Sequence, residues 1–439
     1  MSILIVLACI ILLILLITWG KVNAFIAFLL VSVSAGLLLG IEPGQIGSVL
    51  QKGIGDMLGS LAIVVMAGSM LGKLVAETGA AQRIATGLMA MFGRNWMQAA
   101  FMVTGFVIGL PLFYNVAFIL VFPLIASVVY RYKLPAIFVG LPMVASLSVT
   151  HGFLPPHPSP VALVAQFGAD TGLTLLYGII IAIPTVILAG PLFSRTLGTI
   201  TTNLGGTFQP ASVRDEELPG LANSILTALL PVILLSAATL AGFMNLQAGP
   251  LKTFFGFIGD PSVAMLISLC AGTWTLGLSR GLSMTRVMDI YAGAVRDVAM
   301  VVLIMGGAGG LKQVLNESGV SLQIAGMLDS LDTDPLVLGW LIASLIRVSV
   351  GSATVAGLTA AGIVAPLLAS HPEADPNLMV LAVGAGSLMF SHVNDAGFWL
   401  FKEYFNLSIR DTIRSWSLME TIVAFSGLAG VLVLQAVLH

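Results

Sequence analysis

Residues 148–160 read SVTHGFLPPHPSP, and this stretch interrupts a long apolar run with two histidines and four prolines. Proline inside a helix removes a backbone hydrogen bond and clashes with the preceding turn, so a helix breaks there. At membrane depth, a broken helix survives only where its freed backbone groups are buried in protein or line an aqueous cavity. The stretch therefore predicts a broken helix within 135–168, enclosed by the other helices of a membrane protein.

The composition is typical of a membrane protein. Of the 439 residues, 58% are hydrophobic and 9% are charged, whereas soluble domains carry about 25% charged residues. Apolar runs of membrane-spanning length recur along the chain, and unbroken spans are expected at 3–19, 22–40, 57–76, 172–194, 221–243, 261–279, 297–315 and 415–437. We expect an all-α, multi-pass protein of the inner (cytoplasmic) membrane, with the lipid bilayer as its partner and no nucleic acid.

The sequence predicts no cofactor and no metal site. Cys9 and Cys270 lie in apolar runs, as buried thiols do. His151 and His157 have no cysteine or acidic residue at a ligand spacing. The stretch GSMLGKL (68–74) is one residue too short for a phosphate loop and lacks its Ser or Thr.

A second break, FSHVNDAGFW at 390–399, matches the first in an internal repeat. ETGAAQRIA (77–85) aligns with ESGVSLQIA (317–325), FPLIAS (122–127) aligns with APLLAS (365–370), and His151 then falls opposite His392. Matches in the same order at nearly one offset indicate structural repeats. We expect a first membrane repeat at 1–196, a cytoplasmic linker at 197–220 and a second repeat at 221–439, with its broken helix at 377–401.

The charges of equivalent loops predict that the two repeats have opposite orientation. First-half loops hold basic residues, whereas the matching second-half loops hold acidic ones; the two sets are Arg83, Arg94, Arg131 and Lys133, and Glu317, Asp329, Asp332, Asp334, Glu373 and Asp375. Cytoplasmic loops favour Lys and Arg. This opposition is typical of the inverted-topology repeats of secondary transporters.

The loop charges also predict that segment 97–130 enters and leaves the membrane on the same side, and that segment 335–370 does so too. Each is short for two spans of about 20 residues and a turn, so we expect re-entrant hairpins with tips near 110–117 and 349–357. Two short complete spans remain the alternative for each. The expected architecture is then about ten spanning helices, two of them broken, plus two hairpins.

The tips and breaks hold the candidate substrate-binding residues. Paired broken helices mark binding sites in transporters, and half-helix N-termini attract a carboxylate. The candidates are Tyr114, Asn115, Thr150, His151, Ser352, Thr354, His392 and Asn394. Ser and Thr also cap and pack helices routinely, so a purely structural role stays open for each.

Proton coupling has three candidates: Asp395, His151 and His392. An intramembrane carboxylate is costly and indicates function, and histidine titrates near physiological pH; helix capping and backbone bonding are the structural alternatives. Pro155, Pro156 and His157 are expected to support the break. Arg347 either binds a substrate carboxylate or pairs with an acid, and Lys73 and Lys312 are expected at the membrane interface.

Long motifs of the chain resemble the gluconate permease family of proton symporters. They are SLSVTHGFLPPHPSP (146–160), GSATVAG (351–357) and SHVNDAGFWLFKEYFNLS (391–408), with support from GAAQRIAT (79–86) and IAIPTVILAGPLF (181–193). The resemblance implies a homodimer whose transport domain moves against a scaffold as an elevator. The family often has an acid where this chain has Asn115, so the resemblance shifts the role of proton coupling toward Asp395 and the histidines. The family also often has proline where this chain has Ala396.

The function expected from the sequence is import of gluconate or a close sugar acid by proton symport. A carrier for another small hydroxy or amino acid, such as idonate, glycerate or D-serine, is the nearest alternative. An anion channel would not need inverted halves with paired breaks. We expect no enzyme, since no G-x-S-x-G nucleophile motif precedes a helix.

Overall fold

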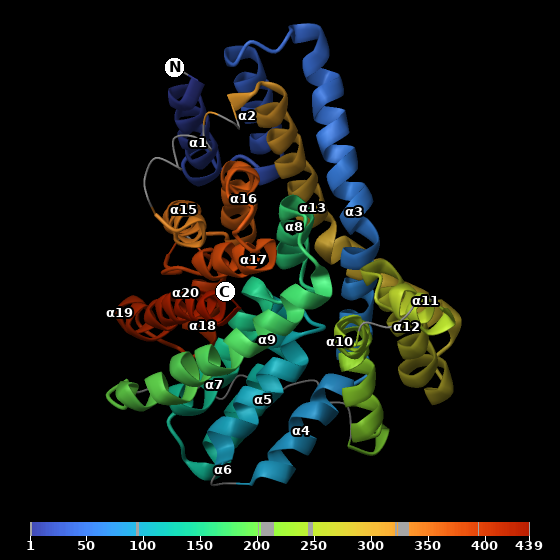
Figure 1. Ribbon diagram of the computed structural model, residues 1–439. Helices are drawn as coiled ribbons and strands as arrows, with labels where there is room; N and C mark the ends of the chain where they lie inside the picture. Colours follow the sequence, from blue (N-terminus) through green and yellow to red (C-terminus); the bar gives the residue numbers. More distant parts are fainter. Residues whose placement is uncertain are drawn as a thin grey trace.

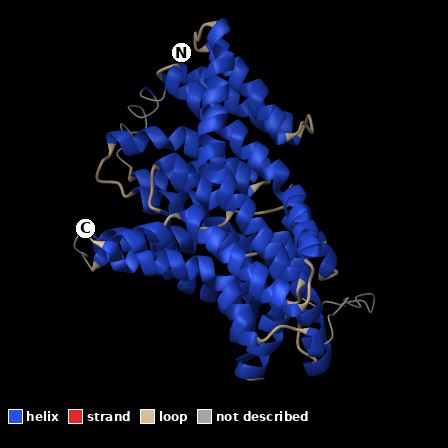
Figure 2. Cartoon of the chain, turned by 90° about the vertical axis from the view of Figure 1, so that its right-hand side faces the viewer, coloured by secondary structure: helices blue, strands red, loops and turns tan. Residues whose placement is uncertain are grey.

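The structure is a computed structural model that describes residues 2–93, 96–200, 202, 215–244, 249–320, 323, 333–393 and 395–438. The described residues form helices joined by loops and turns, with no strand among them (Figure 2). In the first half the helices are α1 (Ser2–Thr18), α2 (Ala24–Leu38), α3 (Pro43–Glu77), α4 (Ala80–Phe92), α5 (Met97–Gly109), α6 (Tyr114–Tyr132), α7 (Ala136–Phe153), α8 (Pro158–Phe167) and α9 (Thr171–Ile187).

The second half follows the expected linker. Its helices are α10 (Leu221–Phe243), α11 (Pro250–Ile258), α12 (Pro261–Gly272), α13 (Met284–Glu317), α15 (Pro335–Val350), α16 (Ala353–Ser370), α17 (Pro376–Gly386), α18 (Ala396–Tyr404), α19 (Ile409–Thr412) and α20 (Leu418–Leu438). Short π-helical segments at Leu188–Leu192, Thr273–Gly277 and Ile413–Ser417 extend α9 and α12 and join α19 to α20.

Each half places the same kinds of element in the same order. A long helix (α3 or α13) comes first, then a helical hairpin (α5–α6 or α15–α16), a broken helix (α7–α8 or α17–α18) and a closing helix (α9 or α20). The hairpin helices of the first half meet at residues 110–113, and those of the second half meet at 351–352. The order agrees with the predicted repeats, while their inversion and the re-entrant nature of the hairpins remain predictions.

Fewer helices than expected have the length of a full span. Among the described residues, six helices are long and apolar enough to cross a membrane, or seven if the bent halves of α3 count as one span. The sequence predicted about ten. The terminal helices α1 and α2 have only 17 and 15 residues, less than the about 20 residues that cross the hydrocarbon core.

The two long helices pack tightly against each other (Figure 1). A Cβ atom built on Gly53 of α3 would lie 2.4 Å from the carbonyl oxygen of Gly309 in α13, and one built on Gly309 would lie 2.5 Å from the carbonyl oxygen of Gly53. Small residues let membrane helices approach to backbone contact. The glycine-rich stretch at 306–310 is therefore a site of close helix packing.

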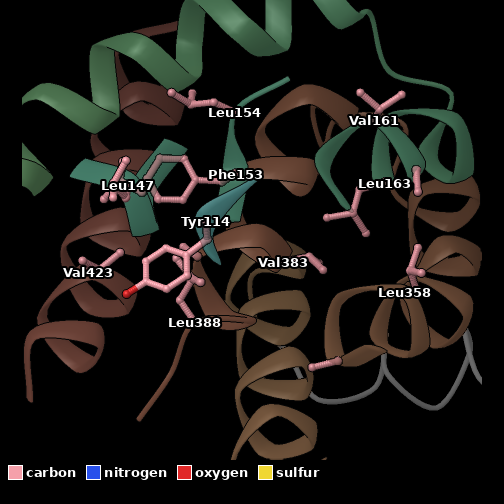
Figure 3. Packing of buried hydrophobic residues seen from close by; sticks show 14 of the residues in the cluster. Tyr114, Leu147, Phe153, Leu154, Val161, Leu163, Leu358, Val383, Leu388 and Val423 are labelled. Carbon is pink, nitrogen blue, oxygen red and sulfur yellow. The ribbon is translucent and has the colours of Figure 1, made fainter. Parts of the chain in front are cut away.

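The two broken helices meet inside the protein. The first break, residues 154–157, is buried, and a Cβ on Gly384 of α17 would lie 2.7 Å from Cβ of Phe153. Figure 3 shows buried apolar side chains that pack in this region, among them Phe153 and Leu154 at the first break, Leu163 of α8, Leu358 of α16 and Val383 of α17. This burial meets the condition for a broken helix at membrane depth.

Candidate functional site: a cavity between tips and breaks

A cavity of about 760 Å³ lies where the hairpin tips and the broken helices converge. Small-molecule sites typically enclose about 300–1,000 Å³, so the volume is in the range of a small-molecule site. Its wall comes from the first tip (Leu112, Phe113, Tyr114, Asn115), α7 (Ser148, His151), the second hairpin (Arg347, Val350, Gly351, Ser352, Ala353, Thr354), the second break with α18 (Asp395, Ala396, Gly397), Trp416, Glu420, and parts of α3 and α13.

Four helix N-termini face this cavity. The first residues of α6, α8, α16 and α18 are Tyr114, Pro158, Ala353 and Ala396, and all of them belong to its wall. Helix N-termini carry partial positive charge and unpaired N–H groups. No side chain caps α6, so the first N–H groups of α6 are free to bond an anion; α8 offers fewer donors, because Pro158 and Pro160 have no N–H.

Asp395 is fixed by three donors at the second break. Nη2 of Arg347 lies 2.6 Å from its Oδ2, which also accepts the hydroxyl of Ser391, and its Oδ1 accepts the N–H of Gly397 at 3.1 Å. Asp395 caps α18, which is the structural alternative foreseen from the sequence, and it also lines the cavity; its role in proton coupling stays a prediction. The guanidinium stabilises the carboxylate as an ion.

Arg347 carries the buried positive charge of the site. Its side chain is only 3% exposed, and its Nε and Nη1 atoms have no hydrogen-bond partner among the described residues. Buried donors without partners are uncommon in folded proteins. Arg347 lines the cavity, and arginine is the side chain best suited to bind a carboxylate.

Glu420 of α20 is a site residue that sequence reasoning missed. It is 1% exposed, lines the cavity, and accepts the hydroxyl of Ser148 at 2.6 Å. A lone acid inside the apolar run 415–437 was the available signal, since intramembrane carboxylates indicate function.

The three central histidines lie in different surroundings. His151 lines the cavity, and its Nδ1 is buried without a partner among the described residues. His157 donates from Nε2 to the carbonyl of Gly109 at the end of α5. His392 donates from Nε2 to the carbonyl of Val348, 2.9 Å away in α15, and is not part of the cavity wall.

The structure thus brings together only part of the predicted set. Tyr114, Asn115, His151, Ser352, Thr354 and Asp395 line the cavity. Thr150 instead donates to the carbonyls of Ser146 and Leu147 in its own helix. Pro155 and Pro156 form the first break, away from the cavity wall. Asn394 lies outside the described residues.

Lys73 also lines the cavity, where we had expected an interfacial position. Its Nζ lies 2.6 Å from Oδ2 of Asp297, which joins α3 to α13 across the wall. Lys312 donates to the carbonyl of Gln166 in α8. Among the residues that the structure describes, no group of three or more His, Cys, Asp or Glu side chains is placed to hold a metal ion.

Comparison with known proteins identifies the family. The model of the GntP family permeases matches residues 1–437. The chain belongs to this family. It is 46% identical over 439 residues to a high-affinity gluconate transporter of Escherichia coli K12, with both chains covered in full. It is also 46% identical over 440 residues to the Gnt-II system L-idonate transporter of the same organism, again over the full length of both.

One further relative and one solved structure are also similar to the chain. A gluconate permease of Bacillus subtilis is 42% identical over 95% of both chains. The structure of the Alcanivorax borkumensis YdaH transporter matches with a TM-score of 0.67 and 17% identity, covering 94% of this chain and 97% of that one. At this identity the match concerns the fold alone. The protein is therefore a multi-pass membrane permease of the GntP family and not an enzyme.

Proposed function

We propose that this GntP permease imports gluconate or a closely related sugar acid across the inner membrane by proton symport. The observation that carries the proposal is the convergence of four helix N-termini and the buried Arg347 side chain on one cavity. Together they supply the positive potential that a carboxylate requires in a low-dielectric site. The gluconate and idonate transporters among the relatives support the same substrate class.

In this proposal the substrate carboxylate lies between Arg347 and the N-terminus of α16. The hydroxyl groups of the sugar acid extend toward Asn115, Ser352 and Thr354, whose side chains line the cavity. Tyr114 closes one side with an aromatic ring whose buried hydroxyl has no partner among the described residues. A hydroxylated substrate could form a hydrogen bond with the Tyr114 hydroxyl, whereas a plain fatty acid would leave it without a partner.

The transport cycle that we propose is an elevator movement in a homodimer. The family resemblance and the ordered pair of hairpins and broken helices support it, because such pairs form substrate sites in repeat-built carriers. The coupling proton needs a titratable group at the cavity. Of the three sequence candidates, Asp395 and His151 line the cavity, whereas His392 bonds Val348.

Uptake by purified protein in proteoliposomes tests this function. An inward proton gradient should drive labelled gluconate above its equilibrium level, and a protonophore should abolish the accumulation. Absence of gluconate uptake under the gradient would overturn the proposal.

L-Idonate is the second candidate substrate, because one relative of equal identity is an L-idonate transporter. A competition panel of unlabelled gluconate, L-idonate, glycerate and D-serine separates the candidates. We expect the two hexonates to compete most strongly, because their longer hydroxylated chains can hydrogen-bond to more of the polar side chains that line the cavity.

A further inference from the structure

Glu420 has an environment that no other carboxyl group of the cavity shares. Its Oε1 accepts the Ser148 hydroxyl at 2.6 Å, while its Oε2 is buried with no partner among the described residues. The side chain is 1% exposed. An ionised carboxylate at such a position lacks the donors that would replace its hydration.

Asp395 is the contrasting case. It receives Arg347, the hydroxyl of Ser391 and the N–H of Gly397. These donors and the positive charge hold it as an anion. Among the described residues of the cavity wall, Arg347 is the only arginine, and its Nη2 bonds Asp395. No cation among the described residues contacts Glu420.

The elements packed against α20 bring few other charges to Glu420. The titratable groups that face it are Tyr114 from α6, Arg347 from α15 and Asp395 from the second break, together with His151 of α7 in the same wall. α17 has no titratable side chain and α9 has only Tyr177. Arg347 and Asp395 largely neutralise each other, so no net positive charge offsets an ionised Glu420.

We propose that Glu420 carries the coupling proton, while Asp395 stays ionised and holds Arg347 in place for the substrate carboxylate. This inference rests on the proposed symport function. With Asp395 ionised, a substrate anion and an ionised Glu420 would bring three negative charges to the single positive charge of Arg347 in one low-dielectric cavity. Glu420 must therefore be protonated when the substrate is bound, and by linkage proton and substrate each raise the affinity for the other.

The proton enters on Glu420 from the outer side together with the substrate. With Oε1 accepting from Ser148, the proton resides on Oε2, and the neutral carboxyl group can then donate a hydrogen bond. On the inner side the substrate leaves, and the proton follows it into water.

The variant Glu420→Gln tests the assignment, because glutamine reproduces the protonated carboxyl and still accepts from Ser148. Exchange of labelled against unlabelled gluconate should persist. Accumulation driven by one pH unit, worth about tenfold per coupled proton, should fall to about onefold, and substrate affinity should lose its dependence on pH. Glu373→Gln is the matched control, since Glu373 is 67% exposed and remote from the cavity; it should keep the accumulation of the unmodified protein.

The two proposals fail in distinguishable ways. No gluconate uptake by the unmodified protein overturns the proposed function. Gradient-driven accumulation by Glu420→Gln equal to that of the unmodified protein overturns the role of Glu420 and leaves the symport function standing.

A second measurement uses the unmodified protein and does not depend on the folding of a variant. An apolar carbodiimide reacts with protonated carboxyl groups in apolar surroundings, and peptide mass spectrometry locates the adduct. We expect modification at Glu420 and none at Asp395, which is ionised and paired. Modification of Asp395 with Glu420 untouched would overturn the proposal.

Discussion

At the scale of single residues, Arg347 is a buried charge whose removal would be costly. It lies in the wall of the cavity, 3% exposed, with one nitrogen on Asp395 and two nitrogens unpaired among the described residues. Removing one partner of a buried pair costs about 3–5 kcal/mol, since the other charge is left uncompensated. A conservative substitution is therefore more informative than a deletion.

The variant Arg347→Lys should keep the fold and weaken substrate binding. Lysine keeps the charge opposite Asp395, but it lacks the planar fork that binds a carboxylate through several N–H groups. Hydrogen bonds to charged groups contribute about 1.5–3 kcal/mol, so KM for gluconate should rise about tenfold or more. Uptake kinetics and the thermal midpoint in detergent measure the two effects.

Arg414→Lys is the matched control for that variant, because Arg414 is 47% exposed at its side chain and lies outside the cavity wall. Unchanged KM is expected there. An Arg347→Lys protein with the KM of the unmodified protein would show that the carboxylate binds elsewhere.

His157 and His392 make equivalent contacts in the two halves. Each donates from a break to a backbone carbonyl near the end of the first hairpin helix, Gly109 in one case and Val348 in the other. The sequence alignment had paired His392 with His151. By contact, His157 is the counterpart of His392, and this arrangement supports a structural role for His157.

The variant His157→Ala should destabilise the protein. It removes the donor to Gly109 from a buried site, and an unsatisfied buried carbonyl costs about 1–3 kcal/mol. Thermal unfolding in detergent should show a lower midpoint, with a smaller loss for His392→Ala because His392 is only half-buried. An unchanged midpoint together with a shifted pH profile of uptake would instead assign His157 to proton transfer.

At the scale of elements, the backbone contact between α3 and α13 sets how closely the two long helices pack. Lys73 and Asp297 bridge the same two helices within the cavity wall. Their side chains are 26% and 52% exposed, so the pair contributes at most about 1 kcal/mol. Glycine packing, and not this ion pair, holds the helices together.

The variant Gly309→Ala should separate these helices and lower stability. The new Cβ would lie 2.5 Å from the Gly53 carbonyl oxygen and 2.6 Å from Cβ of Met57, and overpacking costs about 1–3 kcal/mol. Gly55→Ala in α3 is the control, because nothing lies within 4 Å of its Cβ position; alanine there should be neutral or slightly stabilising. Equal thermal midpoints for both variants would contradict the backbone contact between α3 and α13.

At the scale of the whole molecule, the hairpin tips and the broken helices of both halves surround one cavity, so a carrier must move this site between the two sides. Uptake should then saturate with substrate concentration, and unlabelled gluconate inside the vesicles should accelerate entry of the label. Measurement of counterflow in proteoliposomes checks this. Uptake that rises linearly with concentration, without acceleration by internal substrate, would favour the channel alternative.

Sequence reasoning predicted the features that depend on local pattern. Apolar runs predicted the all-helical membrane class, and the proline-rich stretch 148–160 predicted the break that the structure has at 154–157. The hairpin tips were expected within 110–117 and 349–357, and the helices meet at 110–113 and 351–352. Helix propensity, proline geometry and hydropathy act over a few residues, so they can be read without the fold.

Contacts between distant segments were beyond such reasoning. Arg347 meets Asp395, Ser148 meets Glu420, and Lys73 meets Asp297. None of these pairs follows from periodicity, because each depends on how helices far apart in the chain pack together. The sequence by itself determined the membrane class, the breaks and the family resemblance. Only the tertiary structure decided which polar side chains share the cavity, since the burial and partners of a charge are properties of the packed molecule.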